Sequence, residues 1–269
     1  MNLPPETRNQ IYSYLFLPQR VEISRIKSLT INTTNTKSKT KTKHAYHRLI
    51  SKLVAPRDPE TQVLLSSPNN RKEQTQLSLP FVCKQSYNDT LCPLYACTQF
   101  VFTSPKCISR FMWKSSKAAI ASVNHIELHH IMYNEPSLMK FRHIKLKADK
   151  RWYELCERIS LTLEALEVLH VNVAVYDAPI ELEVGESWSQ SILALGKGNV
   201  KSGKGGALRF ARVKLRSDRF DGQKISTAEK RLEGELMNPV AMQIREDERV
   251  ARELEGPRKA GKVLRLVFN

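Results

Sequence analysis

Three short stretches of the sequence carry residue types whose spacing is typical of catalysis or metal binding. The first, His125-Ile126-Glu127, has the H-x-E spacing of zinc deaminases, in which the histidine binds zinc and the glutamate transfers protons. That signature also needs a downstream P-C-x-x-C segment, and Cys156 is the only cysteine beyond Glu127. The sequence therefore does not support zinc binding of this kind, and we expect no metal site.

The stretch 125–131 is more typical of a strand with one solvated face. Apolar and polar residues alternate along much of it, and successive side chains of a strand point to opposite faces. One face would carry His125, Glu127 and His129, and the other Ile126, Leu128 and His130. A metal site on the first face is the less favoured interpretation, because few ligands converge there.

The other two stretches lack residues that their chemistry requires. Segment 185–189 (GESWS) resembles the turn that carries a nucleophilic serine, but Ser189 replaces the second glycine and no histidine follows His170. Segment 198–205 (GNVKSGKG) has the spacing of a phosphate-binding loop, but Gly205 replaces the Ser or Thr that binds magnesium. We interpret the two segments as a helix start and a flexible linker, and we expect no catalytic residue, no cofactor and no enzymatic activity.

Positive charge is concentrated in two segments of the chain. The 269 residues carry a formal net charge of +16. Segment 25–57 contains nine Lys or Arg and no acidic residue, and segment 196–219 contains eight basic residues against Asp218. The rest of the chain is balanced, so the two segments account for the whole excess. Such an excess raises the question of an anionic partner.

Non-specific binding of nucleic acid by these two segments, in a nuclear protein, is therefore the alternative function that the charge favours. The residues that would contact phosphates are Lys37, Lys39, Lys41, Lys43, Lys201 and Lys204. Lysines on a mobile segment neutralise phosphates without any preformed geometry. No aromatic residue lies among the first four lysines to stack on a base, so we expect no sequence-specific recognition. A solvated loop or a nuclear-import signal is the other interpretation.

Composition limits the class of protein to which the chain can belong and the cellular compartment in which we expect it. The chain is 41% hydrophobic and 26% charged, as in ordinary globular proteins, and no stretch reaches the roughly 20 apolar residues of a membrane-spanning helix. The first ten residues lack the apolar core of a secretory signal. The five cysteines form no C-x-x-C pair, so we expect reduced, largely buried thiols. We therefore expect an intracellular protein, in the cytoplasm or nucleus, without a membrane partner.

Hydrophobic periodicity predicts alternating helices and strands. A helix is expected from Pro5 to about Pro18, and a second with a buried stripe of Cys83, Tyr87, Leu91 and Leu94. Further helices are expected from about 105, from about 149 and over 226–254, and strands at 21–31, 99–103, 125–131, 169–175, 207–216 and 263–268. This rhythm favours an α/β fold of irregular strand–helix units with a largely parallel sheet; a mixed α+β arrangement is the alternative.

The same pattern predicts the domain organisation. We expect a helical module from 1–17 and 77–97, a basic and largely disordered insertion at 18–76, a strand–helix body at 98–195, a Gly/Lys linker at 196–206 and a C-terminal strand–helix–strand segment at 207–269. The insertion includes the low-complexity run NTTNTKSKTKTK, which has nothing to bury.

Two signatures in the sequence resemble those of a large fungal family of F-box-like domains of unknown function. Segment 3–15 (LPPETRNQIYSYL) is similar to that family's opening, LPPEIRNxIYxYL. Segments 82–95 (VCKQSYNDTLCPLY) and 99–102 (QFVF) are similar to its second signature, VCRQIYxEAxPLLY followed by NTFVF. The two signatures occur in the family's order, which makes the resemblance fairly specific for membership.

The resemblance implies N-terminal helices shaped like an F-box, followed by strand–helix units. In F-box proteins such helices dock on a Skp1-type adaptor of a cullin ubiquitin ligase, and the C-terminal region holds the protein target. Carried over to this sequence, the partner-binding or core residues are Leu3, Pro4, Ile11 and Leu15. The residues alone also allow Leu3, Ile11 and Leu15 to pack against the helix at 83–94. We therefore expect a non-enzymatic protein-interaction module, with substrate recognition for ubiquitin ligation as its implied role.

Overall fold

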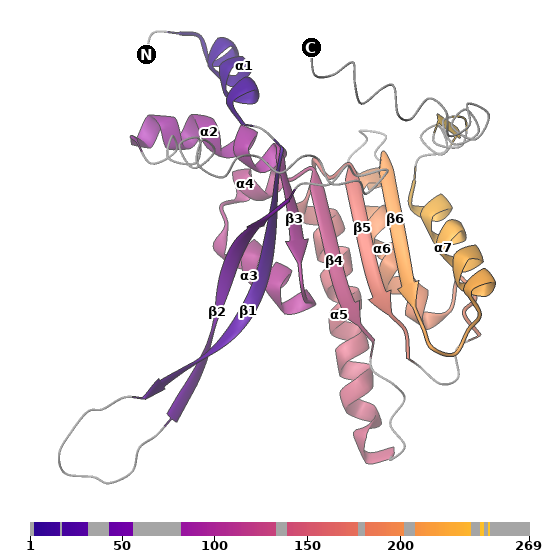
Figure 1. The fold of residues 1–269 in the computed structure, drawn as a ribbon. Coiled ribbons are helices and arrows are strands. Elements are labelled where there is room, and N and C mark those ends of the chain that lie inside the picture. The colour runs from indigo at the N-terminus through magenta and orange to yellow at the C-terminus, as the bar shows by residue number, and fades with distance from the viewer. Residues whose placement is uncertain are drawn as a thin grey trace, which may run out of the picture.

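The computed structural model describes most of the chain. The described residues are 3–16, 18–31, 43–55, 82–132, 139–176, 181–201, 208–237 and the three residues 243, 244 and 247. They form one sheet with helices packed against it (Figure 1).

The sheet has six strands in the order β2-β1-β3-β4-β5-β6. Their bounds are β1 Gln19–Ile31, β2 Lys43–Val54, β3 Thr98–Phe102, β4 His125–Ile131, β5 Val168–Ala174 and β6 Phe210–Arg216. β1 and β2 form an antiparallel pair, while β1, β3, β4, β5 and β6 run parallel. The expected α/β fold with a largely parallel sheet is therefore confirmed.

Helices connect the parallel strands. Their bounds are α1 Pro5–Leu15, α2 Lys84–Ala96, α3 Pro105–Lys114, α4 Lys117–Ala121, α5 Arg142–Thr162, α6 Ser187–Lys201 and α7 Gly222–Leu236, with a 3₁₀ turn at Met139–Phe141. The parallel strands follow one another across the sheet in chain order, so right-handed crossovers place the connecting helices on one face. Figure 1 shows α5 and α6 together behind the strands.

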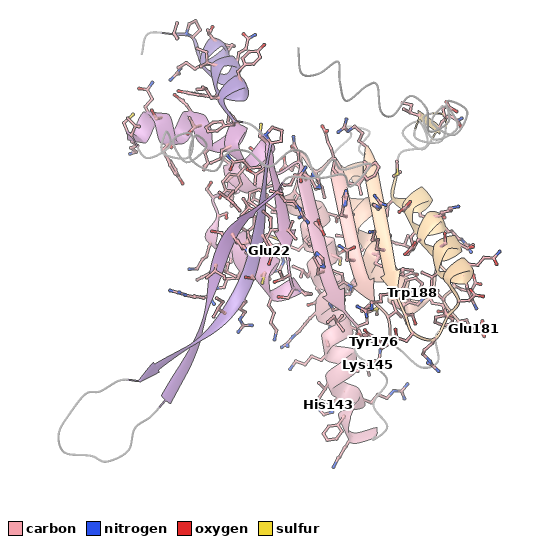
Figure 2. The ribbon with its side chains drawn as sticks, in the orientation of Figure 1. Glu22, His143, Lys145, Tyr176, Glu181 and Trp188 are labelled. Carbon is pink, nitrogen blue, oxygen red and sulfur yellow. The ribbon has the colours of Figure 1, made fainter. Side chains whose placement is uncertain are left out.

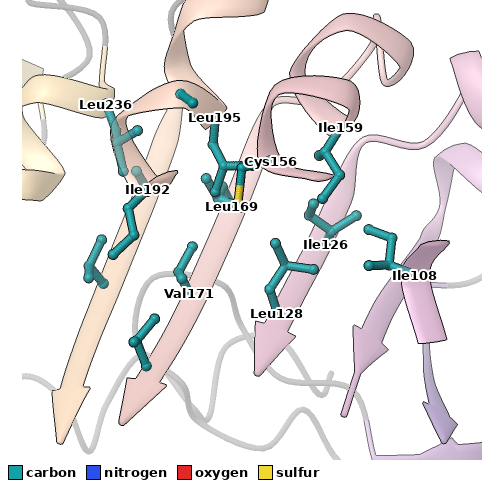
Figure 3. Close-up of a cluster of buried hydrophobic side chains, with 14 of the residues drawn as sticks. Ile108, Ile126, Leu128, Cys156, Ile159, Leu169, Val171, Ile192, Leu195 and Leu236 are labelled. Carbon is teal, nitrogen blue, oxygen red and sulfur yellow. The ribbon is translucent and has the colours of Figure 1, made fainter. Parts of the chain in front are cut away.

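The hydrophobic core lies between that face of the sheet and the helices (Figure 3). Ile126 on β4 is in register with Leu169 on β5, and both are fully buried. Ile159 of α5 and Ile192 of α6 are also fully buried in the same cluster. Alternation along β4 and β5 thus supplies the apolar side chains of this face, and the polar side chains in between lie on the other face.

The turn before α6 explains why segment 185–189 looks like a catalytic turn. Gly185 has a φ of 114°, in the region that glycine adopts without strain. The Ser189 hydroxyl is buried, accepts from the Gly185 N–H over 2.8 Å and donates to the Glu186 carbonyl over 2.9 Å. This serine therefore holds the start of the helix in place.

Two expected irregular segments contain regular structure. Segment 18–76 was expected to be a largely disordered insertion, but β1 and β2 form a long hairpin within it. β1 is stabilised on both sides, because it hydrogen-bonds to β2 and to β3. The expected linker 196–206 begins inside α6, which continues to Lys201. Gly196 permits close packing there, since a Cβ at this position would lie 3.2 Å from the Leu236 side chain of α7.

The predicted stripe on α2 is only partly right. Leu91 and Leu94 are half-buried, but Cys83 is exposed and Tyr87 is 43% exposed. The fully buried residue of the helix is Thr90. α2 packs against α1 and α4 rather than across the main core, so a partly different side of it is covered. The cysteines differ correspondingly from the expected buried thiols: Cys107 and Cys156 are buried, whereas Cys92 and Cys97 are half-buried.

Predictions for the C-terminal region are tested only in part. α7 begins at Gly222, four residues before the expected helix, and ends at Leu236. Residues 263–268, expected to form a strand, lie outside the described residues, as does most of segment 238–254.

Candidate functional site

A polar network occupies the sheet face that the connecting helices leave uncovered. Its centre is Glu127 on β4. Its Oε2 accepts from Nη2 of Arg20 on β1 over 2.8 Å, and its Oε1 accepts from Nδ2 of Asn172 on β5 over 3.0 Å. Nε2 of His129, two residues along β4, lies 3.0 Å from the same Oε1. The network thus joins three strands that are separate in sequence.

This network keeps Glu127 ionised. Burial by itself would raise the pKa of the carboxyl group. The hydrogen bonds from His129 and Arg20, together with the positive charge of Arg20, outweigh burial and lower the pKa to about 2. A carboxylate held in this way is a poor proton donor near neutral pH. The arrangement fits a fixed structural charge better than an acid catalyst.

Three histidines of the central strands are held in the neutral form. Burial, together with the neighbouring His170, lowers the pKa of His125 to about 3. The ring centroids of the two histidines are 5.1 Å apart. Burial likewise lowers the pKa of His170 and of His130 to about 4. The His130 ring stacks on Trp152 of α5 at 4.2 Å. These rings therefore serve as packed, uncharged side chains.

A large cleft opens at the carboxyl ends of the parallel strands. It has a volume of about 1940 Å³ and is lined by the last residues of β3, β4, β5 and β6, by residues of α3 and α5, and by Arg20 and Glu22 at the start of β1 and Val54 at the end of β2. Its Lys and Arg residues are Arg20, Lys106, Arg110, Lys147, Arg151, Arg158, Lys214 and Arg216, and its acidic residues are Glu22, Glu127 and Glu154. Figure 2 shows Tyr176 and His143, which also line the cleft, beyond the ends of the central strands. The cleft is therefore strongly basic.

At the opposite ends of the strands, α1 and α2 form a second surface. α1 leads into β1, and α2 leads into β3, so both helices lie at the amino ends of these strands. The Arg8 guanidinium of α1 forms an ion pair with Asp89 of α2. Tyr12 and Phe16 are buried, which anchors one side of α1.

The two helices also carry exposed apolar side chains. Leu3 is 46% exposed, and Ile11 and Leu15 are each 41% exposed. Pro4, the residue before α1, is exposed as well, and its carbonyl accepts from the Arg8 N–H. The exposed apolar residues here are Leu3, Ile11, Tyr14, Leu15, Val82 and Tyr87, and we call this set the α1–α2 surface.

The six lysines expected to bind phosphate are not brought together by the described structure. Lys37, Lys39, Lys41 and Lys204 lie outside the described residues. Lys43 is the first residue of β2 and Lys201 the last of α6, and their side chains are not described.

The basic cleft was not predicted from the sequence. Six of its eight Lys and Arg residues come from the part of the chain whose net charge is balanced, and only Lys214 and Arg216 belong to segment 196–219, so composition alone does not reveal the cleft. A signal is nevertheless present, because Lys106 and Arg110, and likewise Lys147 and Arg151, are spaced four residues apart. Such pairs lie on the same side of a helix. Helix spacing combined with charge would have indicated two basic stripes.

Metal-ligand groups and membrane-spanning helices were both sought in the part of the chain that the structure describes. No three His, Cys, Asp or Glu residues there are grouped so that they could hold a metal ion. None of the helices described is both long and apolar enough to span a bilayer.

The fold and its surfaces define an α/β protein whose parallel sheet has a basic cleft at one end and an apolar helix pair at the other. Residues 1–195 match the model of a domain of unknown function, DUF7730, and the chain belongs to this family. Neither a curated protein nor a solved structure matches the chain.

Proposed function

We propose that the protein is a non-enzymatic protein-interaction module, in which the α1–α2 surface docks on a Skp1-type adaptor of a cullin ubiquitin ligase. The observation that carries the proposal is the exposure of Leu3, just before α1, and of Ile11 and Leu15 on α1, a helix that Tyr12 and Phe16 anchor. These apolar residues match the positions that the F-box-like resemblance assigns to the adaptor-facing or core set. A short amphipathic helix with unburied apolar residues is a common docking element.

The placement of the two surfaces supports recruitment as the mechanism. The α1–α2 surface lies at the amino ends of the strands, and the basic cleft lies at their carboxyl ends. A partner on one surface therefore leaves the other accessible. Bringing a target close to a ligase requires two separate binding surfaces of this kind, because the gain comes from raised local concentration.

The alternative arrangement, in which Leu3, Ile11 and Leu15 are covered by α2, finds less support. α1 does contact α2, but the contact leaves at least 41% of each of these side chains exposed. The residues that anchor the helix are Tyr12 and Phe16, together with the ion pair between Arg8 and Asp89.

The test is a pull-down of the full chain with a purified Skp1-type adaptor at about 150 mM and about 500 mM salt, since screening separates apolar from electrostatic association. We expect capture at both salt concentrations for the wild type and loss of capture for Leu3→Asp/Ile11→Asp. The matched control is Leu146→Asp/Leu161→Asp, which changes two leucines of α5 that are 58% and 55% exposed. Adaptor docking would be refuted if the adaptor did not capture the wild type, or if the docking variant and the control variant lost capture equally.

A further inference from the structure

The basic cleft has the dimensions of a site for an extended polymer. It runs across the sheet from β1 to β6, along the carboxyl ends of β3, β4, β5 and β6 and beside Arg20 and Glu22 at the start of β1. Neighbouring strands lie about 4.8 Å apart, so four spacings give a length of about 19 Å. A site of this length spans several units of a linear chain rather than one small molecule.

Two helical stripes supply the charge of the cleft. On α3, Lys106, Arg110 and Trp113 are spaced four and three residues apart, and all three line the cleft. On α5, Lys147, Arg151 and Arg158 are spaced four and seven residues apart, which also keeps them on one side of the helix, and all three line the cleft. Residues with this spacing share one side of a helix, so both stripes face the same space.

The balance of charge in the cleft favours a polyanion. Its lining contains eight Lys or Arg residues against three Glu residues. Of the three, Glu127 is already neutralised by Arg20, and Glu154 lies 4.0 Å from Lys150 outside the lining. Lys106, Lys147, Arg151 and Arg158 take part in none of the ion pairs found among the described residues. Their charges are therefore available to a ligand.

An exposed aromatic side chain narrows the class of polyanion. Trp113 is 81% exposed, whereas Trp152 and Trp188 are 3% and 1% exposed. A large aromatic ring left in solvent beside basic residues is the arrangement that binds single-stranded nucleic acids, in which cations follow the phosphates and aromatic rings stack on bases. An acidic polypeptide would use the charges but would leave most of the indole face without a planar partner.

From the two basic stripes and the exposed indole we infer that the cleft binds single-stranded nucleic acid, with Trp113 stacking on a base and Lys106, Lys147, Arg151 and Arg158 contacting phosphates. This site is separate from the α1–α2 surface. The four residues proposed to contact phosphates lie outside the basic segments 25–57 and 196–219, although Val54, Lys214 and Arg216 of those segments also line the cleft. RNA and DNA share the required chemistry, since both present phosphates at regular spacing and unpaired bases.

The test measures anisotropy of labelled oligouridine and oligothymidine, together with tryptophan fluorescence of the full-length protein. Because the other two tryptophans are buried, quenching by a stacked base reports on Trp113, and Trp113→Phe identifies that part of the signal. We expect at least one of the two oligonucleotides to bind and to quench the tryptophan fluorescence. The one that binds more tightly identifies whether the cleft prefers RNA or DNA. Replacing Trp113 by Ala should weaken binding about tenfold, as expected for loss of one stacked base.

The charge contribution is tested with two matched double variants. Lys106→Gln/Lys147→Gln removes two exposed lysines from the cleft, and Lys117→Gln/Lys230→Gln removes two exposed lysines outside it. The first should reduce the slope of log affinity against log salt by about 1.4, because each phosphate contact to a single strand contributes about 0.7. The second should leave the cleft contacts, and hence the quenching of Trp113, as in the wild type.

Three results would overturn the inference. The first is no binding of either oligonucleotide at low salt. The second is equal weakening by both double variants without any change in Trp113 fluorescence, which would place binding on other basic segments. The third is tighter binding of an oligoglutamate, or equal binding of an abasic oligonucleotide, which would indicate an acidic polypeptide or charge alone. None of these results affects capture by the adaptor, because the variants leave the α1–α2 surface intact.

Discussion

Nη2 of Arg20 lies 2.8 Å from Oε2 of Glu127, although the two residues belong to strands that are not neighbours. Arg20 is on β1 and Glu127 on β4, so the ion pair crosses β3. Their side chains are only 11% and 12% exposed. The pair therefore ties the β1–β2 hairpin to the central strands on the face that has no helices.

Replacing Glu127 by Gln should destabilise the protein substantially. The carboxylate accepts hydrogen bonds from Arg20 and Asn172, and its removal leaves the guanidinium nearly buried without a counter-charge. Breaking such a pair costs about 3 kcal/mol of unfolding free energy. Urea denaturation at neutral pH measures this loss directly.

The control for this prediction is Glu22→Gln, which changes a half-buried glutamate on β1 that takes part in none of the ion pairs found among the described residues. We expect its unfolding free energy to stay within about 0.5 kcal/mol of the wild type. A double-mutant cycle of Arg20→Met with Glu127→Gln should give a coupling energy of at least about 1 kcal/mol. A coupling energy near zero would show that the two side chains do not stabilise each other.

Stability should fall as the pH drops below about 6.5. Burial lowers the pKa of His125 to about 3 and of His130 and His170 to about 4, while the unfolded chain keeps the ordinary value of 6.5. Between these values the unfolded state binds more protons than the folded state, so acid favours unfolding. The expected loss between about pH 6.5 and pH 5 is on the order of 1 kcal/mol per histidine.

Unfolding free energies at several pH values, for the wild type and His130→Phe, check this expectation. Phenylalanine retains a ring that can stack on Trp152 but cannot bind a proton, so the pH dependence should become shallower. His143→Phe, at an exposed position of α5, is the matched control and should keep the wild-type slope. An unchanged slope in His130→Phe would mean that this histidine does not contribute to acid sensitivity.

Local pattern accounts for much of the fold but not for the surfaces. The strand at 125–131 was predicted with the bounds that β4 has, because alternation is a local property of the sequence. The β1–β2 hairpin was largely missed, since a polar, lysine-rich composition hides strands that are stabilised by their neighbours. The stripe on α2 was only partly right for a related reason: periodicity identifies one side of a helix, but packing against α1 and α4 decides which residues are buried.

The basic cleft could not be predicted as a site, because its parts lie far apart in sequence. Lys106 of α3 and Lys214 of β6 are separated by more than one hundred residues, and only the parallel sheet brings their elements to one cleft. Glu127 was singled out from the sequence, but its pairing with Arg20 depends on β1 joining the same sheet. Long-range strand order is a tertiary property, which local periodicity does not contain.

Two glutamates of α7 accept hydrogen bonds from backbone N–H groups of the edge strand β6. Removing one of these acceptors should lower the stability of the protein. The N–H of Val213 donates to Oε1 of Glu233 over 2.9 Å, and the N–H of Leu215 donates to Oε1 of Glu229 over 2.7 Å. Glu233→Met keeps a similar shape but removes the acceptor, which leaves a buried N–H unsatisfied and costs about 2 kcal/mol. Thermal and urea unfolding measure the loss.

Glu233→Gln provides the sharpest comparison, since the amide oxygen can still accept from Val213. We expect it to be clearly more stable than Glu233→Met, while Glu235→Met at an exposed position stays near the wild type. An unpaired edge also templates association, so light scattering should rise for Glu233→Met on concentration. Equal stability of the Gln and Met variants would refute the role of the acceptor.

Cys83 should be the most reactive of the five cysteines. It is exposed at the start of α2, where the Ser86 N–H donates to its Sγ over 3.3 Å and the Ser86 hydroxyl lies 3.4 Å away. These contacts lower the pKa of the thiol, whereas burial raises the pKa of Cys156 well above its usual value. Because the thiolate is the reactive form, alkylation of the native protein near neutral pH should label Cys83 first and Cys156 last.

Mass spectrometry of time points gives the order, and Ser86→Ala should slow the labelling of Cys83 by removing the hydroxyl contact. If Cys156 were labelled as fast as Cys83 in the native protein, the prediction would be wrong, because Cys156 is buried and the pKa of Cys83 is lowered.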